Sequence, residues 1–288
     1  VTDDLKWLTR EEYPGLLREI PDSPKQLYVR GALPSPEMKW LAVVGSRACT
    51  NYGRQVCKYL IEGLRGYPIV IVSGLAYGTD AEAHRNAIDT GLTTIGVPGS
   101  GLDWNVLYPK ANVGLAREIL SSGGALISEE EPGARSMNYM FPKRNRIMAG
   151  LSHATLIIEA KEKSGTLITA RLTTEYNREL LVVPGNIFSE ESKGSHLFLR
   201  LGATPITSPA DILVALGIKE REGATSINEL REDLSQDEQR VFEILTTPCS
   251  RDELIESLGL AISEANVLLS TMEIKNLIVE ELGVVRIR

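Results

Sequence analysis

The sequence predicts an α/β fold, a doubly wound and mostly parallel sheet, followed by a smaller C-terminal domain. Two observations predict the sheet: short apolar runs alternate with longer amphipathic stretches from about residue 41, and Gly, Ser, Asn or Pro mark the joins. A third observation predicts the second domain. A charged segment without apolar runs, at 219–233, separates this alternation from three further helical stretches.

The expected strands are rich in Val and Ile and apolar on both faces, as are parallel strands that helices cover on both sides. In chain order they occupy 41–44, 69–72, 93–97, 125–128, 154–160 and 180–183. The stretches between them are expected to form crossover helices at 51–65, 80–90, 112–122, 142–152 and 166–177. Such a Rossmann-like sheet binds ligands beyond the carboxyl ends of its strands, so a site is expected in the loops that follow them.

The predicted domain boundaries follow these patterns. Residues 1–40 contain several prolines and a mixed pattern, which we interpret as a lead-in segment. Because the chain starts at Val1 and not at Met, this segment is expected to be a remnant next to a missing or trimmed N-terminal domain. The Rossmann-like domain is expected at 41–218, a linker at 219–233 and the second domain at 234–288.

The second domain has the pattern of a winged helix, three helices and a strand pair. Ser250 and Glu253 form a capping box before the second helix, and Ser263 begins the third. A winged helix usually binds DNA. From residue 224 onward, however, six Lys or Arg residues stand against thirteen Asp or Glu, a net charge of −7 that repels phosphates. We therefore expect a protein partner for this domain, with DNA binding as the second interpretation.

The composition excludes several classes of protein. The chain has 288 residues, 43% hydrophobic and 24% charged, as in a globular protein and not in a disordered or collagen-like chain. It has no apolar run near the roughly 20 residues of a membrane span and no signal-peptide pattern, so a cytoplasmic location is expected. Three scattered Cys and three isolated His predict no disulfide, no metal site and no Ser-His-Asp triad, and no cofactor is expected. Because the net charge is −7, any nucleic-acid site must be local.

The first candidate site motif, VVGSR, follows the first expected strand. Gly45 permits a sharp turn, and Ser46 and Arg47 stand at the start of the next helix, where backbone amides and a guanidinium suit an anionic oxygen. The spacing is neither the GxGxxG of dinucleotide binding nor the GxxxxGK[ST] of ATP binding, so the motif disfavours both. The alternative interpretation is a Gly that serves only the turn and a solvated Arg.

Ser-Gly pairs mark two further helix starts. Ser73 and Gly74 follow the second expected strand, and Ser164 and Gly165 precede the helix after the fifth. Lys161 comes directly after that fifth strand, which makes it a candidate ligand contact. Three helix starts are therefore expected to face one crevice.

The segment FPKRNRIM gathers cations at a helix start. Lys143, Arg144 and Arg146 lie at the positive end of the helix dipole, where cations are disfavoured unless anions compensate. Phosphate binding and buried ion pairs with the acidic run at 129–131 both explain them, and both interpretations stay open. Phe141, beside the cations, is compatible with base stacking and with core packing.

Nine segments together resemble the DNA-processing protein A family, also called DprA or Smf. In order they are YPGLLREIPDSPKQLYVRG, VVGSR, SGLAYGTDAEAH, GVPGSGLDWNVLYPKAN, ISEEEPG, FPKRNRIMAGLS, IIEAKEKSGTLITA, VVPGN and GSHLFLRLGAT, and they cover about 13–216. The resemblance implies a protein without catalytic activity that binds single-stranded DNA cooperatively. It also implies that the protein loads the RecA recombinase onto that DNA, in natural transformation and recombination.

The resemblance carries over residue by residue. The strand-binding arginine of the family's VGSR motif falls on Arg47, and the lysine of its EAK motif falls on Lys161. Other DNA-binding positions around the same pocket match Ser46, Ser73, Gly74, Arg144, Asn145, Ser164 and Gly165.

The resemblance also implies a homodimer formed through the end of the sheet, at 194–206. Its expected apolar residues are Phe198, Leu199 and Ile206. Exposure of Phe198 and Leu199 would fit such an interface, and a plain amphipathic helix explains these two residues equally well. This chain departs from the family at Thr79, where Ile usually precedes the Asp. Of the N-terminal sterile-alpha-motif domain that many members carry, only the trailing edge is expected here, so functions of that domain do not transfer.

Two other functions stay open. The segment SGTLITARLTTE resembles the Gly-Thr…Glu pattern of Rossmann-like nucleotide phosphoribohydrolases, which would make Glu175 an acid or base and Arg144 a phosphate clamp. The other alternative is a pure adaptor, whose acidic winged helix binds proteins.

Overall fold

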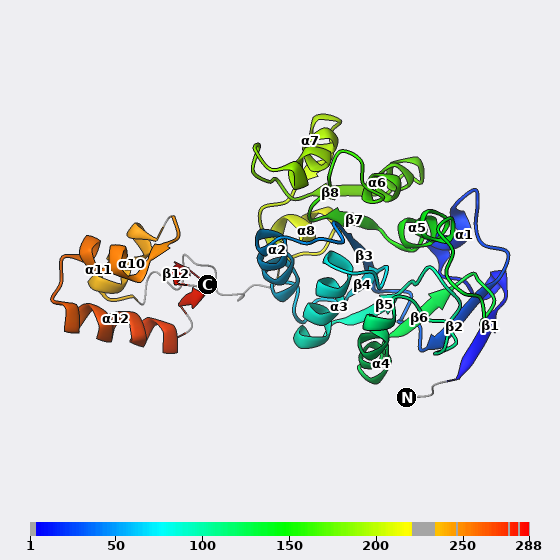
Figure 1. The fold of residues 1–288 in the computed structure, drawn as a ribbon, viewed down its shortest axis with the longest axis horizontal. Helices are drawn as coiled ribbons and strands as arrows, with labels where there is room; N and C mark the ends of the chain where they lie inside the picture. Colours follow the sequence, from blue (N-terminus) through cyan, green and yellow to red (C-terminus); the bar gives the residue numbers. More distant parts are fainter. Residues whose placement is uncertain (1–3, 221–233, 246, 276, 282, 288) are drawn as a thin grey trace. The chain divides into compact units, whose positions relative to one another are not determined.

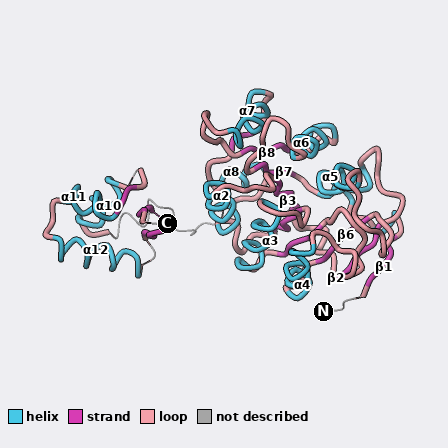
Figure 2. The backbone as a smooth tube through the Cα atoms, in the orientation of Figure 1, coloured by secondary structure: helices cyan, strands magenta, loops and turns pink. Residues whose placement is uncertain are grey.

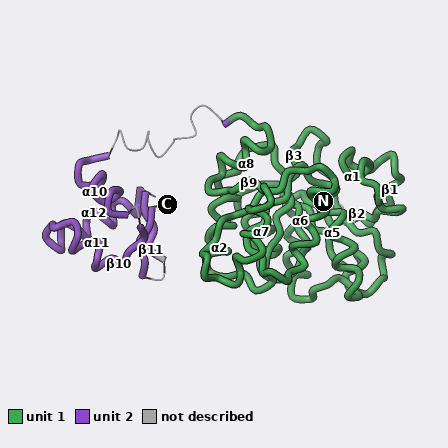
Figure 3. Tube along the Cα trace, turned by 90° about the horizontal axis from the view of Figure 1, so that it is seen from above, with its two compact units in different colours: residues 1–219 green, residues 220–288 purple. Residues whose placement is uncertain are grey.

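The computed structural model describes residues 4–220, 234–245, 247–275, 277–281 and 283–287. They belong to two compact units, 1–219 and 220–288 (Figure 3). Each unit has hydrophobic core clusters of its own.

Unit 1 is built around a nine-stranded sheet in the order β1-β2-β6-β5-β4-β3-β7-β8-β9 (Figure 1). The strands are β1 (Leu5–Leu8), β2 (Leu27–Gly31), β3 (Lys39–Val44), β4 (Ile69–Ser73), β5 (Thr93–Gly96), β6 (Ala125–Ser128), β7 (Ala154–Ile157), β8 (Glu179–Val182) and β9 (Thr204–Pro205). Neighbours from β6 to β9 are parallel, whereas β2 runs antiparallel to both β1 and β6. The chain moves outward from β3 to β6 and then returns to place β7 on the other side of β3. This reversal is the point at which doubly wound sheets bind ligands.

Helices cover both faces of this sheet (Figure 2). They are α1 (Gly15–Glu19), α2 (Asn51–Glu62), α3 (Thr79–Thr90), α4 (Val113–Ser121), α5 (Met140–Leu151), α6 (Thr166–Glu175), α7 (Lys193–Arg200) and α8 (Pro209–Ala215). Successive side chains of β3 explain the two layers. Leu41 and Val43 belong to a core cluster with residues of α2 and α8, whereas Trp40 and Ala42 belong to another with residues of α5. Both faces of the strand are therefore buried, as its apolar run predicts.

The predicted fold class is confirmed, and the six expected strands are present as β3 to β8. The segment interpreted as a lead-in differs from expectation, because it contributes β1 and β2 to the sheet. Polar residues interrupt these two strands, which hides them from a search for apolar runs. In β2 the buried Arg30 stacks on Trp104, with the guanidinium carbon 5.1 Å from the ring centroid.

Unit 2 is a winged-helix domain. Among the residues that the structure describes, its elements are α10 (Gln236–Ile244), β10 (Cys249–Ser250), α11 (Arg251–Leu258), α12 (Ile262–Ile274), β11 (Ile278–Glu281) and β12 (Val284–Ile287), and the sheet order is β10-β12-β11. The predicted capping box is confirmed: Ser250 Oγ accepts from the backbone N–H of Glu253, and the Glu253 carboxylate accepts from that of Ser250. Most of the linker predicted at 219–233 lies outside the described residues.

No single helix among the described residues is long and apolar enough to cross a bilayer. The helices α11 and α12 reach that composition only when taken together, and they are bent by 118° relative to each other.

Candidate functional site

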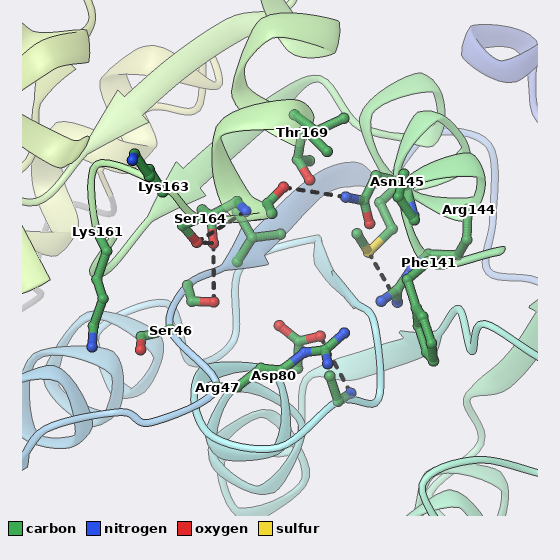
Figure 4. A pocket seen from close by; sticks show the side chains of 18 of the residues that line it. Ser46, Arg47, Asp80, Phe141, Arg144, Asn145, Lys161, Lys163, Ser164 and Thr169 are labelled. Atoms are coloured by element: carbon green, nitrogen blue, oxygen red, sulfur yellow. Dashed lines mark hydrogen bonds between the residues drawn. The ribbon is translucent and has the colours of Figure 1, made fainter. Parts of the chain in front are cut away.

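A cavity of about 590 Å³ opens beyond the carboxyl ends of the central strands, where the sheet order reverses (Figure 4). Four segments line it: the turn after β3, the loop after β4 with the start of α3, the first turns of α5, and the loop between β7 and α6 together with the start of α6. Its principal polar lining residues are Ser46, Arg47, Asp80, Asn138, Arg144, Asn145, Lys161, Lys163, Ser164, Thr166 and Thr169. The three helix starts that the sequence places near one crevice do meet around it.

The turn after β3 is held from both sides. The backbone oxygen of Ser46 accepts from the N–H of Thr79 at 3.1 Å, and the hydroxyl of Thr166 donates to the oxygen of Gly45 at 3.1 Å. Gly78 has φ +69°, and a Cβ at this position would collide with the backbone of the turn. The turn is therefore pinned between the starts of α3 and α6, and it presents Arg47 to the cavity with little freedom of the backbone.

Arg144 is the buried cation of the cavity, only 6% exposed. Its guanidinium donates to the backbone oxygen of Val97 and lies against Gly74, where any Cβ would displace it. Burial lowers the pKa of Arg144 to about 10, and the Asp80 carboxylate opposes this shift. Burial raises the pKa of Asp80, which the charges of Arg144 and Arg47 oppose. Asp80 thus partly neutralises the positive end of the cavity.

Arg47 lies at the cavity rim over an aromatic ring. Its guanidinium carbon is 5.0 Å from the ring centroid of Phe141, and the ring of Tyr108 lies 5.7 Å from that of Phe141. Arg47 is exposed, Phe141 is half-buried and Tyr108 is exposed. A cation and two aromatic side chains, neither of them fully buried, therefore lie next to one another.

The opposite rim is formed by the loop before α6 (Figure 4). Lys161 is exposed, and its Nζ lies 2.9 Å from a carboxylate oxygen of Glu191, which raises the pKa of Lys161. Ser164 Oγ accepts from the N–H of Thr166 at 3.2 Å. Gly165 is the N-cap residue of α6 and supplies no side-chain cap. The start of α6 can therefore offer positive dipole to an anion beside the two lysines of the loop.

Seven of the nine predicted DNA-contact residues line this cavity. They are Ser46, Arg47, Arg144, Asn145, Lys161, Ser164 and Gly165. Ser73 and Gly74 lie beneath it instead: the Ser73 hydroxyl is buried and donates to the backbone oxygen of Val43, and Gly74 supports Arg144. Sequence reasoning missed Asp80, whose only signal was an acidic residue at the start of a helix.

The structure separates the cations at the start of α5. Arg146 pairs with Glu129, and Lys143 lies 2.8 Å from Glu130 and 3.3 Å from Glu129. Of the two interpretations left open, ion pairing thus holds for Arg146 and Lys143. Arg144 alone of these three cations lines the cavity.

The exposure expected of Phe198 is wrong, and Ile206, also expected at the dimer interface, is buried as well. Phe198 is 6% exposed and Ile206 is 1% exposed, and both belong to core clusters of this chain. Leu199 is half-buried and packs against the same cluster as Phe198. The apolar face of α7 covers the sheet of its own chain, which leaves these side chains little surface for a second copy.

The catalytic arrangement considered as an alternative is not assembled. Glu175 ends α6 and lines a second cavity of about 430 Å³ with Arg171 and Arg178, whereas Arg144 lines the first. An acid and its phosphate clamp must converge on one substrate, and these two residues do not. Within the described residues, no group of three or more His, Cys, Asp or Glu could hold a metal ion.

Fold and cavity together define a Rossmann-like α/β protein with a cationic cavity at the switch point of its sheet and an attached winged-helix unit. The chain belongs to the family of DNA recombination-mediator protein A, DprA. The model of that family matches residues 5–217, and that of the DprA winged helix domain matches residues 228–283.

Individual relatives agree with this assignment. The chain is 42% identical to DNA processing protein DprA of Streptococcus pneumoniae over 201 residues, which are 70% of each protein. It is 40% identical to Protein Smf of Escherichia coli over 203 residues, 70% of this chain and 54% of that protein, so the match spans about half of the E. coli relative.

Two solved structures are similar to this chain. The X-ray structure of DNA processing protein A from Streptococcus pneumoniae has a TM-score of 0.69 and 37% identity, and the match covers 75% of each chain. DNA processing protein A from Helicobacter pylori, described for its unique single-stranded DNA binding mode, has a TM-score of 0.65 and 30% identity. That match covers 74% of this chain and 95% of the other.

Proposed function

We propose that this protein binds single-stranded DNA in the cavity of unit 1 and loads the RecA recombinase onto it, in recombination and natural transformation. The observation that carries the proposal is the convergence of Arg47, Lys161 and the start of α6 around one accessible cavity beside Phe141. Membership of the recombination-mediator family supports it, as does the single-stranded DNA binding described for the Helicobacter pylori relative.

The division of roles follows from the chemistry of the lining. Arg47, Lys161 and Lys163 are exposed cations suited to phosphate oxygens. Phe141 offers a ring face on which an unstacked base can lie, which a single strand allows and a stacked duplex does not. Phosphate contacts and stacking distinguish bases poorly, so no sequence preference is expected.

The test is a fluorescence anisotropy titration of labelled oligo-dT and a matching duplex, at low and high salt. Arg47→Ala and Lys161→Ala should each weaken binding by about tenfold and reduce the salt slope by about one, because each removes one charged phosphate contact. Lys58→Ala is the matched control, since Lys58 is an exposed cation on α2 that does not line the cavity. Equal affinities of all four proteins, or a preference for the duplex, would overturn the proposal.

RecA loading and the lack of an enzymatic activity belong to the same proposal. The separation of Glu175 from Arg144 supports a role without catalysis. Loading is tested by RecA filament formation on oligo-dT that is first coated with a single-strand binding protein. Wild type should shorten the lag, and Arg47→Ala should not.

We also propose that the protein forms a homodimer through the end of the sheet that carries α7. The contacts are made by surface residues and not by Phe198 and Ile206, which are buried. Exposed apolar side chains at this end support it: Ile187 and Phe188 follow β8, and Leu201 follows α7. Sedimentation should show a dimer that Phe188→Asp dissociates, and a monomeric wild type would exclude it.

A further inference from the structure

The helix α12 of unit 2 presents a face unlike that of a solvated helix. Ala265, Leu269 and Met272 of α12 are buried in the core of the unit. The opposite side, here called the outer face of α12, consists of Ser263, Val267, Ser270 and Ile274. It carries no charge, and Val267 and Ile274 are 68% and 82% exposed. Val267 and Ile274 are seven residues apart, so their solvent-exposed aliphatic side chains lie on the same side of the helix.

This face lies where a DNA-reading protein would need cations. The helices α11 and α12 meet at 118°, the angle of a helix-turn-helix pair, and α12 holds the place of the helix that enters the major groove. Yet α12 contains no Lys or Arg. If α12 entered a groove of duplex DNA, the helix would have no cation of its own to neutralise the phosphates.

The cations beside α12 are already paired with carboxylates. Arg251 Nη1 lies 2.9 Å from Glu273 and 2.8 Å from Glu280. Lys275, just after the helix, lies 2.7 Å from Glu238. Releasing either cation for a phosphate would leave its carboxylate unpaired, so the geometry disfavours DNA here.

The negative charge around the outer face of α12 favours a basic partner. Residues 234–287 contain four Lys or Arg and ten Asp or Glu, a net charge of −6. Glu264 on α12 and Asp252 and Glu256 on α11 are exposed. A second copy of this unit would bring like charge against like charge, whereas a basic segment would be attracted.

We propose that the outer face of α12 docks a protein segment that carries an aliphatic stripe flanked by Lys or Arg. Val267 and Ile274 would bury against the stripe, and the surrounding carboxylates would pair with its cations. This role is separate from DNA binding in unit 1 and makes the winged helix a protein adaptor.

The probe is a labelled amphipathic peptide of about 18 residues, with Leu at helical spacing and Lys elsewhere, titrated against the full chain. A scrambled peptide of the same composition and a peptide with Glu in place of Lys are the controls. We expect the amphipathic basic peptide alone to bind, and its affinity to fall with salt. The variant Val267→Ser/Ile274→Ser should weaken binding by about tenfold or more, because it removes two apolar contacts.

Both substitutions are at exposed positions, so the fold should tolerate them. Val214→Ser, at a residue of α8 in unit 1 that is similarly exposed, is the matched control and should bind the peptide like wild type. Oligo-dT affinity of the double variant should also be unchanged. Equal binding of the scrambled or acidic peptide, or undiminished binding by the double variant, would overturn the proposal. So would binding of duplex DNA that the double variant loses, or a dimer that it dissociates.

Discussion

Neighbouring carboxylates partly neutralise the positive charge of the cavity. Lys161 faces Glu191 at 2.9 Å, and the buried Arg144 has Asp80 as its counter-charge. An anionic ligand must compete with both carboxylates, so these acids set the affinity as much as the cations do. The two pairs differ in burial: the Lys161 ammonium is exposed to solvent, whereas Asp80 and Arg144 are buried.

Glu191→Gln should strengthen single-stranded DNA binding. The substitution keeps the size of the side chain and frees Lys161 from its ion pair, and a rise in affinity of about threefold at low salt is expected for one surface charge pair. The same anisotropy titration measures it. Glu190→Gln is the matched control, because Glu190 pairs with Lys193, outside the cavity, and should change affinity less. If Glu191→Gln binds no better than Glu190→Gln, Lys161 does not contact phosphate.

For single residues, the sequence predicts which side chains line the cavity better than it predicts which side chains they contact. Arg47 and Lys161 were predicted correctly to line one cavity, because the carboxyl ends of neighbouring parallel strands must meet. Their partners were not predicted, since Phe141 and Glu191 come from distant segments whose side-chain directions depend on packing. Likewise, nothing in the sequence distinguishes Arg144, which lines the cavity, from Arg146, which pairs with Glu129.

The elements of unit 1 are joined by buried polar contacts as well as by apolar packing. His84 of α3 is fully buried, and its Nδ1 lies 2.7 Å from the hydroxyl of Thr94 in β5. That hydroxyl donates to the oxygen of Ile71 in β4, so the imidazole must donate to it. The contact links a helix to two strands next to the cavity. It leaves Nε2 buried without a hydrogen-bond partner, so a second proton on the ring would bury an uncompensated charge.

The stability of unit 1 should therefore fall in mild acid. Burial lowers the pKa of His84 to about 3, and the charge of Arg144 adds to this shift. The unfolded chain binds a proton below about pH 6.5 that the folded chain does not, so stability is full above pH 6.5 and is lost as pH falls toward 3. The loss from this residue is at most about 1.4 kcal/mol per pH unit.

Denaturant unfolding of wild type and His84→Gln between pH 7 and 4.5 isolates this contribution, because the other titrating groups are common to both proteins. The stability difference between the two should shrink as pH falls. His196→Gln is the control and should retain the wild-type slope, since His84 is intact in it. A pH-independent difference between wild type and His84→Gln would show that His84 does not titrate as its burial requires.

Among the elements, those buried on both faces were predictable and those at the edge were not. Strands such as β3 and β4 are continuous apolar runs, which only a covered parallel sheet explains. In β1 and β2 the polar residues Lys6 and Arg30 break the run. The amphipathic pattern of α7 shows that the helix has an apolar side, but it does not show what that side covers. Exposure of Phe198 was therefore expected, whereas the side chain packs into the core of its own chain.

Charge is divided unevenly over the whole molecule. Residues 1–219 contain 24 Lys or Arg and 23 Asp or Glu, a net charge of +1, whereas residues 220–288 contain 7 and 15, a net charge of −8. The cationic cavity thus belongs to the nearly neutral unit, and the acidic unit carries the outer face of α12. This division agrees with the proposals that unit 1 binds nucleic acid and that unit 2 binds protein.

A chain that ends at Lys219 should fold and bind single-stranded DNA like the full chain. All lining residues of the cavity lie in unit 1, and the three core clusters that support its sheet contain no residue beyond 218. Removing a charge of −8 reduces repulsion of DNA only at low salt, so affinities for oligo-dT should agree at about 0.2 M salt, where charges more than about 8 Å apart are screened. The truncated chain should lose the amphipathic basic peptide completely. Loss of oligo-dT binding by a truncated chain whose circular dichroism shows it to be folded would mean that unit 2 contributes to the DNA site.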